Sequence, residues 1–109
     1  MERVNSKLNE IDFMTLEKEL IAKVEKYQKL TERALKEIKM EKGINEKEKK
    51  IAEDFLQMAK NYLTDGKYHA EKGELLVALA SYSYAHAWLD AGVRARILHA
   101  EDDQLFTLP

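Results

Sequence analysis

The stretch that decides the fold is GELLVALASYSYAHAWLDAGVRAR, residues 73–96. Residues 75–89 contain no Asp, Glu, Lys or Arg, whereas charged side chains make up 35% of the whole chain. A helix that is apolar on every side is normally buried on every side. We therefore expect residues 74–98 to form the most buried helix of a small all-α protein.

Two amphipathic helices are predicted ahead of this segment, over residues 15–41 and 45–72. Mostly apolar side chains in the first recur at steps of three and four residues, which is the period of one helix face. They are Leu16, Leu20, Val24, Tyr27, Thr31, Ala34 and Ile38. The second begins with Asn45 and Glu48, whose spacing is that of a capping box. With residues 74–98, these segments predict an up-down-up bundle of three long helices.

One glycine decides whether the second helix is continuous. The stretch TDGK around Gly66 could form a turn, but the inward-facing stripe continues in phase through it. We predict a continuous helix to residue 72. A glycine inside a helix costs about 1 kcal/mol relative to alanine, so we expect Gly66 to permit the close approach of a neighbouring helix.

The 109 residues are expected to form a single domain, 1–109, with a leader over residues 1–14 and a tail over residues 99–109. The tail ends with Leu105, Phe106 and Leu108. These side chains could fold back over the central helix or serve as a short docking motif. We favour the covering role.

The composition excludes several classes of function. The chain has no Cys, which excludes disulfides, thiol catalysis and Cys-based zinc sites. A net charge of −2 favours neither nucleic acid nor a membrane surface. The N-terminus lacks the apolar run of a signal peptide, and the central apolar run is too short to span a bilayer, so the cytoplasm is the expected location. There is no glycine-rich phosphate loop, zinc-protease motif or nucleophile elbow, so we predict no catalytic residue, metal or cofactor.

The segment Tyr62–Asp90 resembles a tetratricopeptide unit, in which small and aromatic residues occupy set positions of two antiparallel helices. The residues at that spacing are Tyr62, Gly66, Gly73, Ala78, Tyr82 and Ala85. Asp65 and His69 depart from the pattern, and no second copy follows. The resemblance implies a helical hairpin and a packing role for Gly66.

Residues 71–94, EKGELLVALASYSYAHAWLDAGVR, also resemble an uncharacterised archaeal family, domain of unknown function 357. The resemblance rests on Glu71-Lys72-Gly73, Ala78, Tyr84-Ala85-His86 and Leu89-Asp90-Ala91, and the terminal Leu105-Phe106-Thr107 is similar as well. It implies a small three-helix bundle and an archaeal source, and it implies no activity. A composition rich in Lys and Glu is also typical of hyperthermophiles.

Four residues step by four along one ridge of the central helix: Tyr82, His86, Asp90 and Arg94. His86 could donate to Asp90, and Asp90 could pair with Arg94. An oriented His–carboxylate pair can act as a general base or supply part of a metal or small-ligand site, centred on Tyr82, His86 and Asp90. We favour a polar ladder that satisfies its own hydrogen bonds near the end of an apolar helix.

Arg94 and His99 have the spacing of an Arg-x4-His motif found in nucleases built on small helical bundles. Ala95 stands where such nucleases usually have a polar residue. The alternative function is therefore a nucleic-acid-acting enzyme that uses Arg94 and His99. The competing interpretation is that the arginines favour the negative C-terminal end of the helix.

A second ridge of the central helix carries small side chains at steps of four, with a tryptophan beside them. The candidate interface residues are Ser83, Ala87, Trp88, Ala91 and Ala95. The small ridge could pack against a second copy of the chain or against the first helix, and the sequence leaves both open. Our leading hypothesis is a non-enzymatic interaction module that forms a homodimer or docks an unidentified protein partner.

Overall fold

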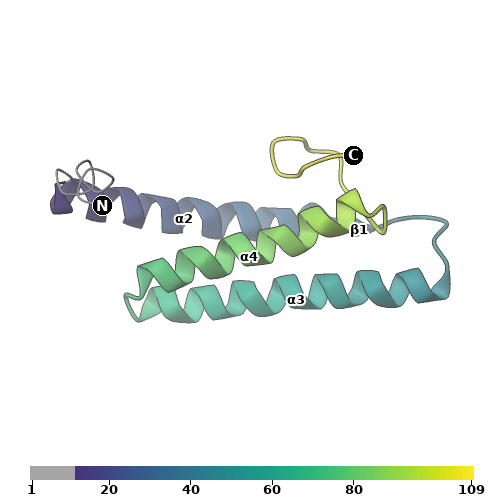
Figure 1. Ribbon diagram of the computed structural model, residues 1–109, viewed down its shortest axis with the longest axis horizontal. Helices are drawn as coiled ribbons and strands as arrows, with labels where there is room; N and C mark the ends of the chain where they lie inside the picture. Colours follow the sequence, from purple (N-terminus) through teal and green to yellow (C-terminus); the bar gives the residue numbers. More distant parts are fainter. Residues whose placement is uncertain (1–11) are drawn as a thin grey trace, which may run out of the picture.

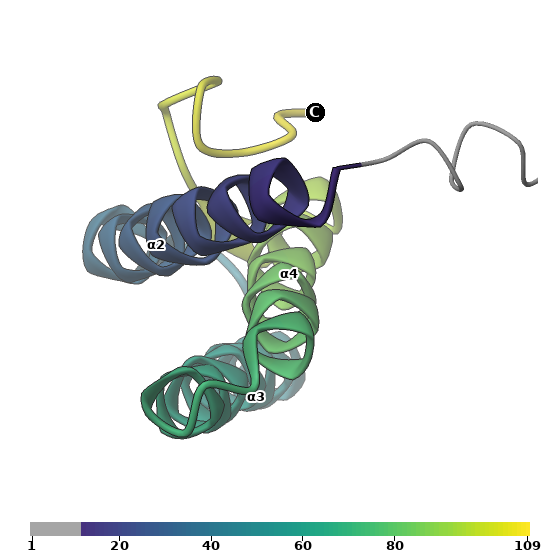
Figure 2. The same ribbon diagram turned by 90° about the vertical axis from the view of Figure 1, so that its left-hand side faces the viewer.

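The computed structural model describes residues 12–109 and consists mainly of three long helices. These are α2 (Phe13–Glu37), α3 (Glu46–Glu71) and α4 (Leu75–Arg94). They alternate in direction along one long axis, which confirms the predicted up-down-up, all-α arrangement (Figure 1). Viewed along that axis, α4 lies between α2 and α3 (Figure 2).

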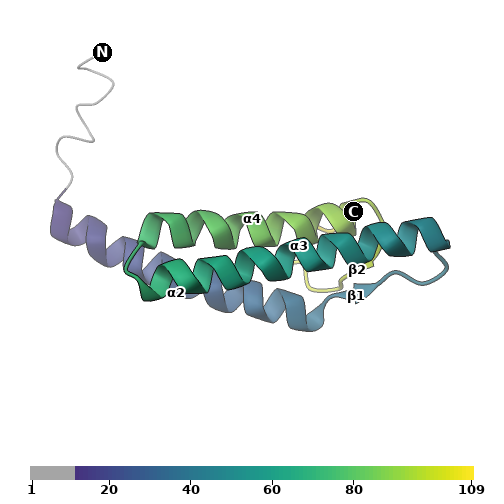
Figure 3. The same cartoon turned by 90° about the horizontal axis from the view of Figure 1, so that it is seen from below.

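The first helix begins earlier than predicted. Asp12 is its N-cap, and the Asp12 side chain accepts a hydrogen bond of 3.2 Å from the Met14 backbone N–H. Residues 13 and 14 therefore belong to α2, and the predicted leader is reduced to residues 1–11, which lie outside the described part of the chain. The first turns of α2 extend past the turn between α3 and α4 (Figure 3).

The first and third helices end earlier than the predicted residues 41 and 98. A short antiparallel pair takes their place, in which β1 (Lys39–Met40) pairs with β2 (Leu98–His99). Arg96 turns the chain away from α4 with a φ of 63°, and the Ile97 N–H donates to the Gly92 carbonyl at 3.1 Å. The chain thus folds back at residue 96, so that Ile97 and Leu98 are buried from an extended segment.

The second helix agrees with the sequence prediction to within a residue at each end. Asn45 Oδ1 accepts from the Glu48 N–H at 2.8 Å, and Glu48 Oε1 accepts from the Asn45 N–H at 3.0 Å, which completes the predicted capping box. The helix runs through Gly66 without a break. Gly73, with a φ of 77°, then makes the turn into α4.

Gly66 packs directly against the ring of Tyr82, as the close approach predicted from the sequence requires. A Cβ added at Gly66 would lie 2.6 Å from Tyr82 Cδ1, closer than real side chains come. The Tyr82 side chain is fully buried, in a cluster with Val24 of α2 and Ala78 of α4. A second and larger cluster surrounds Leu89 and Val93 nearer the C-terminal end of α4.

The central helix is the most buried of the three, but it is not buried on every side. Six of its residues are buried, compared with three each in α2 and α3. Its outward face exposes Leu76, Val77 and Tyr84 by 72%, 46% and 52% of their surface. The expectation that an apolar helix is buried on every side was wrong, because within residues 12–109 only two helices and part of the tail cover α4.

Candidate functional site

The polar ladder of α4 binds the backbone of the tail. His86 Nε2 donates to the carbonyl of Leu105, Asp90 Oδ1 accepts from the Thr107 N–H at 2.9 Å, and Arg94 donates to the carbonyl of Leu108 at 2.8 Å. Three side chains one helical turn apart therefore hold the main chain of residues 105–108 along α4. The contacts predicted within the ladder, from His86 to Asp90 and from Asp90 to Arg94, are replaced by contacts with the tail.

Two apolar side chains anchor the tail. Leu105 and Phe106 are each only 4% exposed, and both join the core cluster around Leu89 and Val93. Leu108 packs against the same cluster and is half-buried. The tail therefore covers the C-terminal half of α4, on the side of the molecule away from α3 (Figure 2).

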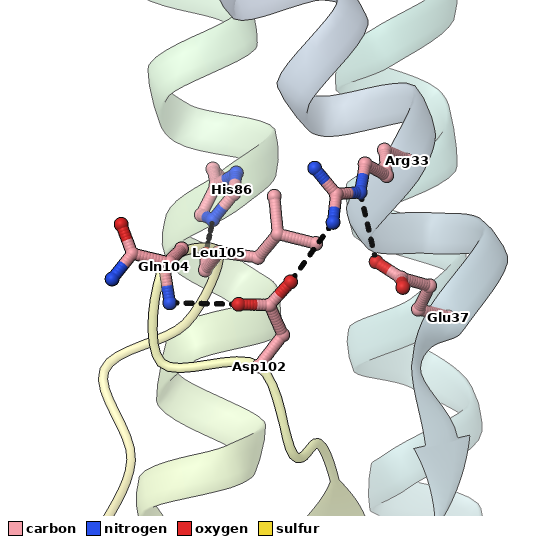
Figure 4. Close-up of polar contacts among 6 residues, drawn as sticks. All are labelled: Arg33, Glu37, His86, Asp102, Gln104 and Leu105. Atoms are coloured by element: carbon pink, nitrogen blue, oxygen red, sulfur yellow. Dashed lines mark hydrogen bonds and ion pairs between the residues drawn. The ribbon is translucent and has the colours of Figure 1, made fainter.

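An ion pair joins the start of the tail to α2. Arg33 donates to Asp102 at 3.0 Å and also pairs with Glu37 at 3.3 Å. The other carboxylate oxygen of Asp102 accepts from the Gln104 N–H at 2.9 Å, which shapes the turn before Leu105 (Figure 4). Both ion pairs are partly exposed, so each contributes at most about 1 kcal/mol.

Tyr82, the first member of the predicted ladder, does not touch the tail. Its ring lies in the core, and its hydroxyl donates to Gln28 of α2 at 3.2 Å. Burial raises the pKa of the Tyr82 phenol above its usual value, and the carboxylates of Glu32 and Glu71 add to the effect. Tyr82 is thus a core residue that links α4 to α2.

The raised pKa of Tyr82 predicts a loss of stability in alkali. The unfolded chain releases the phenol proton near pH ~10 and the folded chain only at higher pH, so the free energy of unfolding falls as the pH rises above that value. Urea unfolding between neutral and strongly alkaline pH should show this fall, and Tyr82→Phe should make it shallower. Tyr68→Phe is the control because Tyr68 is exposed. Equal slopes for the wild type and Tyr82→Phe would contradict the assignment.

Arg94 and His99, the two residues of the nuclease hypothesis, lie in separate environments. The Arg94 guanidinium is bound to the tail. The His99 ring lies in β2, with ring nitrogens 3.4 Å from Glu41 and 3.3 Å from Glu101. An anionic phosphate would meet two carboxylates beside this imidazole, which disfavours nucleic-acid chemistry here.

No metal site is evident in the described part of the chain. Within residues 12–109, no group of three or more His, Cys, Asp or Glu side chains is placed to hold a metal ion. His86 and Asp90, which the sequence suggested as ligands, each bind the tail backbone through one side-chain atom, His86 Nε2 and Asp90 Oδ1. The same residues include no helix long and apolar enough to cross a membrane.

The small-residue ridge is exposed along its whole length, and its first two members, Ser83 and Ala87, border an open hollow between α4 and α2. Ser83, Ala87, Ala91 and Ala95 are all exposed, so the alternative in which this ridge packs against the first helix does not hold. Trp88 lies at the edge of this face, is half-buried, and packs edge-on against Phe55 with ring centroids 5.0 Å apart. Tyr84 packs similarly against Tyr62 at 4.5 Å. The aromatic residues thus close the seam between α3 and α4, while the ridge remains open.

Sequence reasoning found the ladder and the ridge but missed what the ladder holds. The spacing of four marks one face of a helix, which is a local property of the sequence. Arg33 and Asp102 are 69 positions apart, and no pattern connects them. The exposed Leu76 and Val77 were also missed, because an apolar residue carries no sign of whether it is covered.

A comparison with known families assigns the chain. The model of a family described as "Protein of unknown function (DUF357)" matches residues 26–98. The chain belongs to this family. The DUF357 match begins within α2 and ends in β2, so it contains the ladder and the C-terminal part of α2, whereas the tail segment bound by the ladder lies beyond it. No curated protein and no solved structure matches the chain. Membership of DUF357 brings no assigned activity.

Proposed function

We propose that the protein is a non-enzymatic interaction module that self-associates through the exposed face of α4. The observation that carries the proposal is the exposure of Leu76, Val77 and Tyr84 on a helix face that carries no charge between residues 75 and 89. Contiguous exposed apolar surface is typical of interaction sites, because burying it removes apolar area from water. Two copies would meet there without bringing like charges together.

The distribution of side-chain size along this face favours an antiparallel pair. The large side chains Leu76, Val77 and Tyr84 lie in the N-terminal half of α4, and the small Ala87, Ala91 and Ala95 lie in the C-terminal half. An antiparallel pair related by a two-fold axis sets the large half of each copy against the small half of the other. A two-fold interface is self-complementary by construction, and this gradient of size provides the complementarity.

Light scattering over a dilution series tests the proposal. We expect the wild type to show twice the mass of the chain at high concentration and to dissociate on dilution. Ala87→Glu and Ala91→Glu place a carboxylate in the centre of the interface and should leave a folded monomer. Ala22→Glu is the matched control, because Ala22 is exposed on α2 away from this face. A wild type that stays monomeric throughout, or variants that dimerise as it does, would overturn the proposal.

A further inference from the structure

The groove between α2 and α4 is only partly filled by the tail. In its C-terminal half, Leu105 and Phe106 are buried and the ladder holds the main chain. Ahead of Gln104 and Leu105 the groove continues as an open hollow. Its walls come from both helices: Lys26, Tyr27 and Leu30 of α2, and Ser83, His86, Ala87 and Asp90 of α4.

A turn at Asp102 keeps the tail out of this hollow. The Asp102 carbonyl accepts from the backbone N–H groups of Leu105 and Phe106, at 3.1 and 3.0 Å. The chain therefore reaches Leu105 from β2, turns, and runs back along α4 towards Arg94, so its loop projects over the helices (Figure 1). A peptide that entered in an extended conformation would instead pass through the hollow before reaching the position of Leu105.

The site recognises a peptide mainly through the peptide's backbone atoms. His86, Asp90 and Arg94 contact two carbonyls and one N–H, which every residue except proline at the N–H position can supply. Side-chain selectivity comes from the two buried positions, which take Leu and Phe. In the hollow, Tyr27 and Leu30 favour an apolar side chain, and Lys26 of α2 favours a carboxylate. Within residues 12–109, the one carboxylate that lines the hollow, Asp90 of α4, accepts from the main chain at the Thr107 position.

We propose that the α2–α4 groove is a binding site for an extended peptide of a partner protein, with an acidic and an apolar residue ahead of a Leu-Phe pair. In the structure, the tail of the chain itself occupies part of this groove. A short tether gives the tail an effective concentration on the order of millimolar, and the partner peptide displaces it through the added contacts in the hollow. The hollow shows that the groove extends beyond what this tail fills, and the residues of α2 and α4 that line it lie within the part of the chain matched by DUF357.

The experiment uses the full chain with Phe106→Ala, which weakens the resident tail. The probe is a fluorescein-labelled peptide, Asp-Phe-Ala-Gln-Leu-Phe-Thr-Leu-Pro, and the readout is fluorescence anisotropy. We expect this variant to bind the probe about tenfold more tightly than the wild type, because the tail competes less. Adding Lys26→Glu should weaken binding about threefold or more through charge repulsion. Lys29→Glu makes the same change of charge at an exposed α2 position outside the hollow and should have no effect.

Three results would overturn the proposal. The first is a folded variant, by circular dichroism, that does not bind the probe at about 1 mM, the concentration scale of a tethered tail. The second is an equal effect of Lys26→Glu and Lys29→Glu. The third is a dimer of the variant that forms without probe and persists when Ala91→Glu is added to remove the α4 interface, because exchanged tails would then assign the groove to a second copy. If Phe106→Ala does not fold, Leu108→Ala replaces it, because Leu108 is less buried and its removal costs less.

Discussion

Replacing Phe106 with alanine is expected to lower the free energy of unfolding by about 3 kcal/mol, the lower end of the range for a buried phenylalanine. The Phe106 side chain is 4% exposed and packs with Leu105 against the core around Leu89 and Val93. The lower end applies because the tail forms the edge of this core and can move to close part of the space. A domain of this size has about 5–15 kcal/mol of stability, so the variant should still fold.

Urea unfolding followed by circular dichroism measures this loss, and Thr107→Ala is the matched control. Thr107 is the next residue and is exposed, and its contact to Asp90 is made by the backbone N–H, which alanine keeps. We expect Thr107→Ala to unfold within about 0.5 kcal/mol of the wild type. If Phe106→Ala lowered the free energy of unfolding as little as Thr107→Ala, the tail would not be part of the core. The groove would then be open without displacement of the tail.

The role of the tail could be predicted from the sequence, but its path could not. The covering role of Leu105 and Phe106 followed from the apolar surface of the central helix, which needed more cover than two helices provide. The route of the tail did not follow, because it depends on Asp102 making a turn and on backbone atoms meeting His86, Asp90 and Arg94. Nearly every residue has the same backbone N–H and carbonyl groups, so the amino-acid sequence does not show which of them will be contacted.

The end of the central helix was missed for a related reason. Ile97 and Leu98 continue the apolar pattern of α4, and no glycine stands at the point where the helix stops. Arg96 takes the positive φ that glycine usually supplies at a helix end. The chain then reverses, and a Cβ added at Gly92 would lie 2.8 Å from Leu98 Cγ. Gly92 therefore makes room for the returning segment, a role that only the three-dimensional contact reveals.

The sequence predicts a close contact between helices at Gly66. We therefore expect Gly66→Ala to lower the free energy of unfolding. Alanine gains about 1 kcal/mol in helix propensity over glycine. The added methyl group would collide with the Tyr82 ring, which is fully buried and cannot swing into solvent. Overpacking of this kind costs about 1–3 kcal/mol. Because the collision involves several ring atoms, we expect the cost to exceed the gain, with a net loss of about 1–2 kcal/mol.

Urea unfolding of a double-mutant cycle separates the two contributions. Thr64→Ala, at an exposed position of the same helix, should gain a few tenths of a kcal/mol from propensity alone. Tyr82→Leu removes the ring, so Gly66→Ala made in that background should be neutral or stabilising. A loss of similar size with and without the ring would mean that the methyl group meets something other than Tyr82. A gain in the wild-type background would mean that α3 and α4 can separate at Gly66 without cost, and the close approach would then not stabilise the hairpin.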